Sequence, residues 1–218
     1  MLNKNLRFKR PIILYGNGET PEKPFVLKKL FESKSIICVD GGVDKIIKLG
    51  LKVKLILGDM DSIESDIETY KTNFFRLNDQ SKTDLEKSLE WCIEFGIKEL
   101  SLIGFSGGRD DHAMNTLLII KSFSNRIDIT YYTNYSMIKC IKSDTNFKTY
   151  PGQRISIIPT SENIKITTSG LEFPLKSTIL RSPGHGISNI AKGHEFSINS
   201  QELVWVFFNI DELYKTNK

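Results

Sequence analysis

The sequence predicts an α/β fold in which a mainly parallel sheet is followed by a small antiparallel β domain. In the first part of the chain, short apolar runs alternate with stretches whose apolar residues recur at helical spacing. After about residue 135, short β-branched or aromatic segments are separated by Gly and Pro. The chain has 218 residues, 39% of them hydrophobic, enough for one good core or two modest ones. We expect an α/β domain at residues 1–137 and a β domain at residues 138–218.

The first domain alternates strands and helices. Continuous apolar strands between helices are typical of a parallel sheet covered on both faces, so a Rossmann-like arrangement is expected. In such sheets, ligands bind at the carboxyl ends of the strands. The expected strands are residues 11–14, 35–39, 55–57, 74–77, 100–103 and 127–132, and the expected helices are residues 25–33, 43–49, 83–95 and 111–122.

The second domain is predicted to be an antiparallel sandwich or part of a barrel. Its short segments are β-branched or aromatic, and Gly or Pro residues lie between them. The expected strands are residues 154–158, 163–167, 177–180 and 203–208.

Composition excludes several classes of protein. The formal net charge of +4 is too mild, without a long basic run, for a nucleic-acid-binding surface. No apolar run approaches the roughly 20 residues that span a bilayer, and residues 1–10 lack a secretory-signal pattern. A cytoplasmic protein without nucleic-acid or membrane partners is therefore expected. The odd, widely spaced cysteines, Cys38, Cys92 and Cys140, indicate buried thiols.

Two aspartates, Asp59 and Asp61, follow the apolar run at residues 55–57. In an extended segment, residues i and i+2 point to the same side, so both carboxylates can face one cation. Gly58 before them would let a ligand approach the backbone closely. Mg²⁺ is usually held by one or two carboxylates together with substrate phosphates. The pair alone would also fit a polar strand end or an Asx turn.

Four expected strand ends carry glycine or acidic residues. They are residues 16–18, 40–42, 58–61 and 104–111. Since the carboxyl ends of parallel strands share one edge of the sheet, this convergence favours a phosphate-handling site. The first two segments alone also fit ordinary turns, and neither matches a Walker phosphate loop or a dinucleotide fingerprint.

Residues 79–86 combine a helix start with a cation. Thr83 and Glu86 fit a capping box, and Asp84 in the first turn complements the helix dipole. Lys82 lies beside the positive end of that dipole, which is expected only if an anion also lies there. A helix N-terminus with Lys82 could bind phosphate, and Asp84 could be a third metal carboxylate.

The segment 104–112 is a glycine-rich loop followed by charged residues. Asp110 or Asp111 could cap the next helix. Arg109 offers a planar fork for phosphate oxygens. Asp111 could orient that guanidinium or approach a reacting hydroxyl, and His112 is expected to be a structural hydrogen-bonding residue.

Together these segments resemble the thiamine pyrophosphokinase family. The matching stretches are residues 40–44, 57–62, 79–84, 107–112, 170–175 and 188–189, in the family's order over nearly the whole chain. The resemblance implies that Mg²⁺ assists transfer of a diphosphate group from ATP to thiamine, releasing AMP. It also implies a homodimer with thiamine bound between one subunit's α/β domain and the other's β domain.

The resemblance assigns roles to particular residues. The implied catalytic residues are Asp59, Asp61, Asp84, Arg109 and Asp111, and the metal is surrounded by Asp59, Asp61 and Asp84. ATP and its phosphates are bound by Asp40, Gly41, Gly42, Gln80, Lys82 and Thr83. Thiamine is bound by Ser188 and Asn189.

Two departures affect the acceptor end of the site. Ile190 replaces the asparagine or acidic residue usual in this family, and the loop at residues 182–186 is unusual in carrying Pro and His. Two alternatives therefore stay open. One is a pyrophosphokinase acting on another hydroxymethyl heterocycle, such as a pterin, and the other is a module that binds a nucleotide or thiamine without turnover.

Overall fold

The computed structural model describes residues 6–59, 70 and 72–210. The chain divides into two compact units, Met1–Asn134 and Tyr135–Lys218. The domain boundary expected from sequence, between residues 137 and 138, lies slightly C-terminal to this division. Within the described residues, no helix has the length and apolar character needed to cross a membrane. All three cysteines are buried and free, as the sequence predicts.

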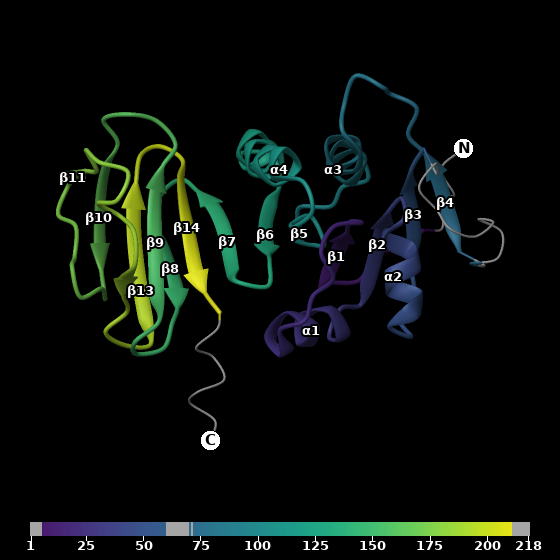
Figure 1. Cartoon of the computed structure of the whole chain (residues 1–218). Coiled ribbons are helices and arrows are strands. Elements are labelled where there is room, and N and C mark those ends of the chain that lie inside the picture. The colour runs from purple at the N-terminus through teal and green to yellow at the C-terminus, as the bar shows by residue number, and fades with distance from the viewer. Residues whose placement is uncertain (1–5, 60–69, 71, 211–218) are drawn as a thin grey trace. The chain divides into compact units, whose positions relative to one another are not determined.

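The first unit is built on a parallel sheet, which confirms the predicted fold class (Figure 1). Its strands follow the order β6-β5-β1-β2-β3-β4, and every pairing among them in the described residues is parallel. The central strands are buried along their whole length, as continuous apolar runs require. The bounds are β1 (Ile12–Tyr15), β2 (Ser35–Val39), β3 (Leu55–Gly58), β4 (Asn73–Arg76), β5 (Glu99–Ile103) and β6 (Asp128–Tyr132).

Two pairs of helices cover this sheet. The helices α1 and α2 lie on one face of the sheet, and α3 and α4 lie on the other (Figure 1). This follows from right-handed crossovers, because the chain moves along the sheet in one direction from β1 to β3 and in the opposite direction from β4 to β6. Contacts between α3 and α4, and between α2 and β2, agree with this arrangement. The bounds are α1 (Pro24–Phe31), α2 (Gly42–Lys48), α3 (Asp84–Glu94) and α4 (Asp110–Phe123), so each predicted helix is confirmed to within a turn.

The strand order reverses at β1. This strand pairs with β2 on one side and with β5 on the other, and the chain leaves it in one direction first and in the other later. At such a reversal the helices that follow the two strands lie on opposite faces of the sheet, which leaves room for a ligand at the carboxyl ends of the strands. The topology therefore positions a ligand site between the loops that follow β1 and β5.

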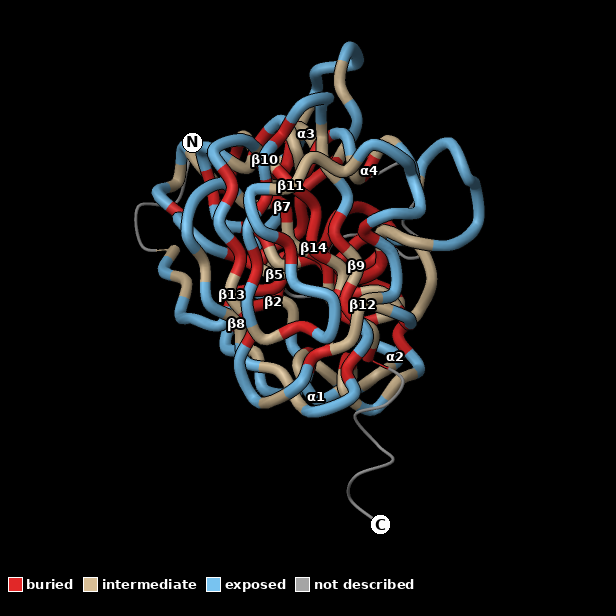
Figure 2. The backbone as a smooth tube through the Cα atoms, turned by 90° about the vertical axis from the view of Figure 1, so that its left-hand side faces the viewer, coloured by how far each residue is buried: buried red, intermediate tan, exposed pale blue. Residues whose placement is uncertain are grey.

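The second unit contains two antiparallel sheets. One has the order β12-β9-β14-β7 and the other β11-β10-β13-β8. A buried cluster drawn from strands of both sheets, including Ile155, Ile166, Phe196 and Phe208, forms the core, and buried backbone is red in Figure 2. The bounds are β7 (Ser136–Ile141), β8 (Thr145–Lys148), β9 (Arg154–Pro159), β10 (Lys165–Ser169), β11 (Thr178–Ile179), β12 (Asn189–Ile190), β13 (Glu195–Ser200) and β14 (Val204–Asn209).

Candidate active site

A cavity of about 750 Å³ lies in the first unit at the carboxyl edge of the parallel sheet. Its lining comes from the loops after β1, β2 and β5, from the start of α3 and from the first three turns of α4. The site therefore forms at the point where the strand order reverses. The residues that line it are Asn17, Gly18, Glu19, Val39, Asp40, Thr83, Asp84, Leu85, Gly104, Phe105, Gly107, Gly108, Arg109, His112, Asn115, Thr116 and Ile119.

The loops after β1 and β5 pack directly against each other. A Cβ atom at Gly16 would lie 2.6 Å from the Gly104 carbonyl oxygen, and one at Gly104 would lie 2.6 Å from the Gly16 carbonyl oxygen. The amide of Gly18 donates to the Gly104 carbonyl at 2.6 Å. Lys45 donates from Nζ to the carbonyl of Asn17 at 2.8 Å and to that of Gly18. These glycines are therefore required by close backbone approach, which a turn pattern alone did not indicate.

The carboxylate of Asp40 occupies the space beside Gly58. A Cβ atom at Gly58, whose φ is +145°, would lie 1.7 Å from Asp40 Oδ1. Asp40 is 6% exposed, has a φ of 44°, and donates its amide to the Leu57 carbonyl at 2.9 Å. The expectation that Gly58 admits a ligand is therefore wrong, because the protein's own carboxylate fills the space. Asp59 follows directly, whereas Asp61 lies outside the described residues.

The predicted capping box at the start of α3 is confirmed. Thr83 Oγ1 accepts a hydrogen bond from the Glu86 amide at 3.4 Å, and Glu86 Oε2 accepts one from the Thr83 amide at 3.1 Å. The box fixes the first turn, in which Asp84 lines the cavity. Asp84 Oδ1 lies 2.7 Å from Nζ of Lys87, one turn further along the helix.

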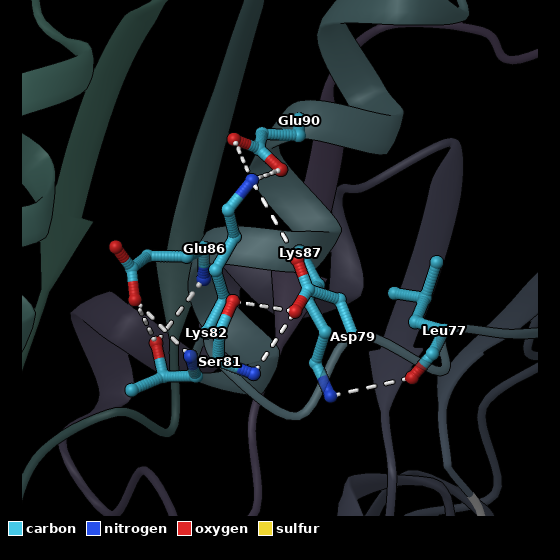
Figure 3. Close-up of polar contacts among 8 residues, drawn as sticks. Leu77, Asp79, Ser81, Lys82, Glu86, Lys87 and Glu90 are labelled. Carbon is cyan, nitrogen blue, oxygen red and sulfur yellow. Dashed lines mark hydrogen bonds and ion pairs between the residues drawn. The ribbon is translucent and has the colours of Figure 1, made fainter.

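Lys82 has a protein partner that local sequence did not indicate. Its Nζ lies 2.8 Å from both carboxylate oxygens of Glu90 and 3.8 Å from Asp79 Oδ2 (Figure 3). The hydrogen bond to Glu90 raises the pKa of Lys82 above its usual value. The inference that Lys82 needs a bound anion is therefore wrong, since Glu90 supplies the negative charge. Among the described residues, the cavity lining includes neither Lys82 nor Gln80.

Arg109 and Asp111 form a two-point ion pair at the start of α4. Arg109 Nε donates to Asp111 Oδ1 at 3.1 Å, and Nη2 donates to Oδ2 at 2.5 Å. The guanidinium lowers the pKa of Asp111, and the carboxylate raises that of Arg109. Arg109 is the N-cap residue without a side-chain cap, so the expected cap by Asp110 or Asp111 is wrong; both aspartates lie in the first turn.

The carboxylates at this edge fit a magnesium ion that is completed by substrate phosphates. The described residues, which leave out Asp61, contain no group of three or more His, Cys, Asp or Glu side chains close enough to hold a metal by themselves. Mg²⁺ needs only one or two carboxylates when phosphate oxygens supply further ligands. Asp84 lines the cavity, and Asp59 directly follows Gly58, the last residue of β3, against which the buried Asp40 carboxylate lies. This hard oxygen donor set suits Mg²⁺.

The second unit holds the residues expected to bind thiamine. Ser188 has a φ of 59°, and its amide donates to Ser156 Oγ at 3.0 Å. The Asn189 side chain accepts from the Phe173 amide at 3.1 Å and donates to the Phe173 carbonyl at 2.7 Å. Asn189 therefore fixes the backbone of Phe173, whose side chain is exposed.

Comparisons with known proteins agree with this geometry. The thiamin pyrophosphokinase catalytic domain matches residues 27–146, and the thiamin pyrophosphokinase vitamin B1 binding domain matches residues 140–205. The chain belongs to the thiamin pyrophosphokinase family. The catalytic-domain match includes Asp40, Asp59 and Arg109. The match to the vitamin B1 binding domain includes Ser188 and Asn189.

Individual thiamin pyrophosphokinases resemble the chain in sequence and in fold. Thiamin pyrophosphokinase 1 of Caenorhabditis elegans is 27% identical over 186 residues, covering 78% of this chain and 76% of the relative. Thiamine pyrophosphokinase of Bacillus subtilis is 30% identical over 155 residues, covering 65% and 70%. The crystal structure of the Bacillus subtilis protein has a TM-score of 0.78 at 22% identity, covering 92% of this chain and 98% of that one. The Candida albicans structure has a TM-score of 0.77 at 15% identity, covering 92% and 90%.

The structure adds residues that sequence reasoning missed. Glu19 and Asn115 line the cavity together with His112, which was expected to be only structural, and with Asn17 of the strand end at residues 16–18 that the sequence indicated. Glu19 directly follows that strand end, so its position was a usable signal. Asn115 had no such signal, because it lies inside α4 and reaches the cavity only as a result of how that helix is oriented in the fold.

Proposed function

We propose that the protein transfers a diphosphate group from ATP to the hydroxyl group of thiamine and releases AMP and thiamine diphosphate. The hydroxyl oxygen forms a bond to the β-phosphorus, and the bond from this phosphorus to the oxygen bridging it to the α-phosphorus breaks. The hydroxyl proton is lost, and AMP leaves with the bridging oxygen. The observation that carries the proposal is the cavity where the strand order reverses, lined by Arg109 and Asp84, in a chain of this family.

Charge neutralisation and alignment supply most of the catalysis in such a transfer. Arg109 is exposed and presents a planar guanidinium that can hold phosphate oxygens at two points. Its pairing with Asp111 orients it in advance, which lowers the entropy lost on binding. Asp111 is also proposed to lie near the transferred group.

Magnesium would be held by Asp59, Asp61 and Asp84, and when bound it would neutralise charge on the triphosphate. The loop residues Asp40, Gly41 and Gly42, with Gln80, Lys82 and Thr83, are proposed to bind ATP and its phosphates. For Lys82 this requires exchanging Glu90 for a phosphate group, because Glu90 now holds its ammonium group. The triphosphate carries enough negative charge to compete with one carboxylate.

The second unit is proposed to recognise thiamine. Asn189 bonds to both backbone groups of Phe173, Ser188 directly precedes Asn189, and the exposed ring of Phe173 offers a flat apolar surface to a heteroaromatic substrate. Replacing Phe173 with alanine should raise KM for thiamine about 10-fold while changing KM for ATP little. Steady-state kinetics with each substrate varied in turn measure both constants. Equal changes in the two constants would contradict a role restricted to thiamine.

The test of the reaction is product analysis after incubation with ATP, Mg²⁺ and thiamine. Equal amounts of AMP and thiamine diphosphate, formed only when Mg²⁺ is not chelated, would establish the reaction and its metal requirement together. Binding of ATP without AMP formation would refute the transfer to thiamine, and hydroxymethylpterins would then be tested as acceptors. Absence of AMP with every acceptor would favour a binding module.

We also propose a homodimer in the cytoplasm, as the family resemblance and the sequence composition predict. Light scattering coupled to gel filtration measures the mass of the assembly, and a monomer at micromolar concentration would contradict the dimer. Fractionation of cells, followed by detection of the protein in each fraction, tests the location.

A further inference from the structure

Lys87 is a buried lysine close to the cavity. Its side chain is 6% exposed, whereas the nearby ion-paired Lys82 is 38% exposed. Lysines are almost never fully buried unless they are paired, because removing the ammonium group from water is unfavourable. The position of Lys87 therefore calls for a specific partner rather than general solvation.

Two oxygen atoms face the Lys87 ammonium group. Nζ lies 2.7 Å from Asp84 Oδ1 and donates to the Leu77 carbonyl at 3.3 Å, a bond drawn in Figure 3. The amide of Leu77 in turn donates to the Gly58 carbonyl at 2.9 Å. Since Gly58 directly precedes Asp59, Lys87 connects the carboxylate on α3 to the strand end that carries Asp59.

The two sides of the Asp84 carboxylate differ in exposure. Oδ1 is buried, although the side chain as a whole is 43% exposed and lines the cavity. The exposed surface of the Asp84 side chain therefore does not come from Oδ1. Holding Oδ1 on Lys87 fixes the rotation of the carboxylate and leaves its other oxygen for a ligand in the cavity.

We propose that Lys87 is a positioning residue that orients Asp84 toward the metal–nucleotide complex and keeps it in register with Asp59. This inference rests on the proposed function, because it takes Asp84 as a ligand of the magnesium that accompanies ATP. Lys87 itself touches neither metal nor substrate. Groups that orient metal ligands typically change metal affinity or activity by about 10- to 100-fold when they are removed.

The test measures binding of magnesium with α,β-methylene-ATP by calorimetry. This nucleotide cannot release AMP, because a methylene group replaces the oxygen between the α- and β-phosphorus atoms. The Lys87→Met variant should bind about 10-fold more weakly than the unchanged protein, and Asp84→Asn should be weakened at least as much. The double variant should bind no more weakly than Asp84→Asn alone, since residues that act through one another are non-additive.

Two further variants separate positioning from folding. Lys98→Met removes an exposed lysine and should leave binding unchanged. Lys87→Arg keeps the charge and the donors and should bind within about 3-fold of the unchanged protein, which supplies the comparison if Lys87→Met unfolds. Urea unfolding of every variant shows whether a loss of binding reflects a loss of structure.

The outcomes distinguish this inference from the proposed function. Additive losses in the double variant, or normal binding by Lys87→Met or Asp84→Asn, would overturn the positioning role. If the unchanged protein binds the magnesium–nucleotide complex and the losses are non-additive, but no thiamine diphosphate forms from ATP, the acceptor assignment fails while the role of Lys87 holds.

Discussion

Replacing Gly58 with alanine should destabilise the protein strongly, because two effects add at this position. The φ of +145° is unfavourable for any residue with a Cβ atom, which costs about 1–3 kcal/mol. The new Cβ atom would also lie 1.7 Å from Asp40 Oδ1, so the buried carboxylate must move. Displacing a buried polar group from its partners costs roughly 1–3 kcal/mol more. The sum is about 2–6 kcal/mol, a large part of the roughly 5–15 kcal/mol that stabilises a typical domain.

Gly50→Ala is the matched control for this substitution. Gly50 has a φ of +73°, but a Cβ atom there would meet nothing within 4 Å, so only the backbone effect of about 1 kcal/mol is expected. Urea unfolding of both variants gives the free energies, provided that the m-values agree. Adding Asp40→Gly to Gly58→Ala should recover stability by removing the obstructing carboxylate. Equal losses for the Gly58 and Gly50 variants would refute the assigned contact.

Three more predictions concern the site. Asp59→Asn should lower turnover at least ~100-fold without moving the urea midpoint, and near-normal activity in the folded variant would remove the metal assignment. Thr83→Ala should lower the free energy of unfolding by about 1 kcal/mol through loss of the capping box, and an unchanged midpoint would contradict this. Arg109→Gln should raise the pKa of Asp111 toward its usual value of about 3.9, as followed by NMR titration of the carboxyl group. Because the pKa of Asp111 is lowered in the folded protein, the ion pair stabilises the fold above the usual aspartate pKa, and this stabilisation is lost as pH falls through the lowered value. An unchanged pKa of Asp111 in Arg109→Gln would show that the pair is absent in solution.

The parallel sheet could be predicted because its strands are buried on both faces. Complete burial leaves continuous apolar runs such as β2, which are visible in sequence without any knowledge of neighbours. The strands β7 and β13 escaped prediction, since one face of each is partly exposed and polar residues interrupt their apolar positions. The turn residues around them indicated the β domain but not every strand in it.

The candidate site was predictable where the chemistry is local. The capping box of Thr83 and Glu86 depends on residues three apart, and the structure confirms it. Lys82 and Glu90 are eight residues apart in the sequence. The contact between Asp40 and Gly58 depends on the pairing of the neighbouring strands β2 and β3. Such contacts follow from three-dimensional packing. The sequence therefore suggested an unpaired charge at Lys82 and free space at Gly58, whereas the fold pairs the first and fills the second.

The reciprocal approach of Gly16 and Gly104 has a consequence for engineering the cavity. Neither position can gain a side chain unless both backbones separate, so enlarging one residue cannot be offset by changing the other. Libraries aimed at reshaping the cavity should therefore leave this pair untouched. Gly108 is a better starting point, because it lines the same cavity and a Cβ atom there would meet open space, although its φ of +75° favours asparagine among the first replacements.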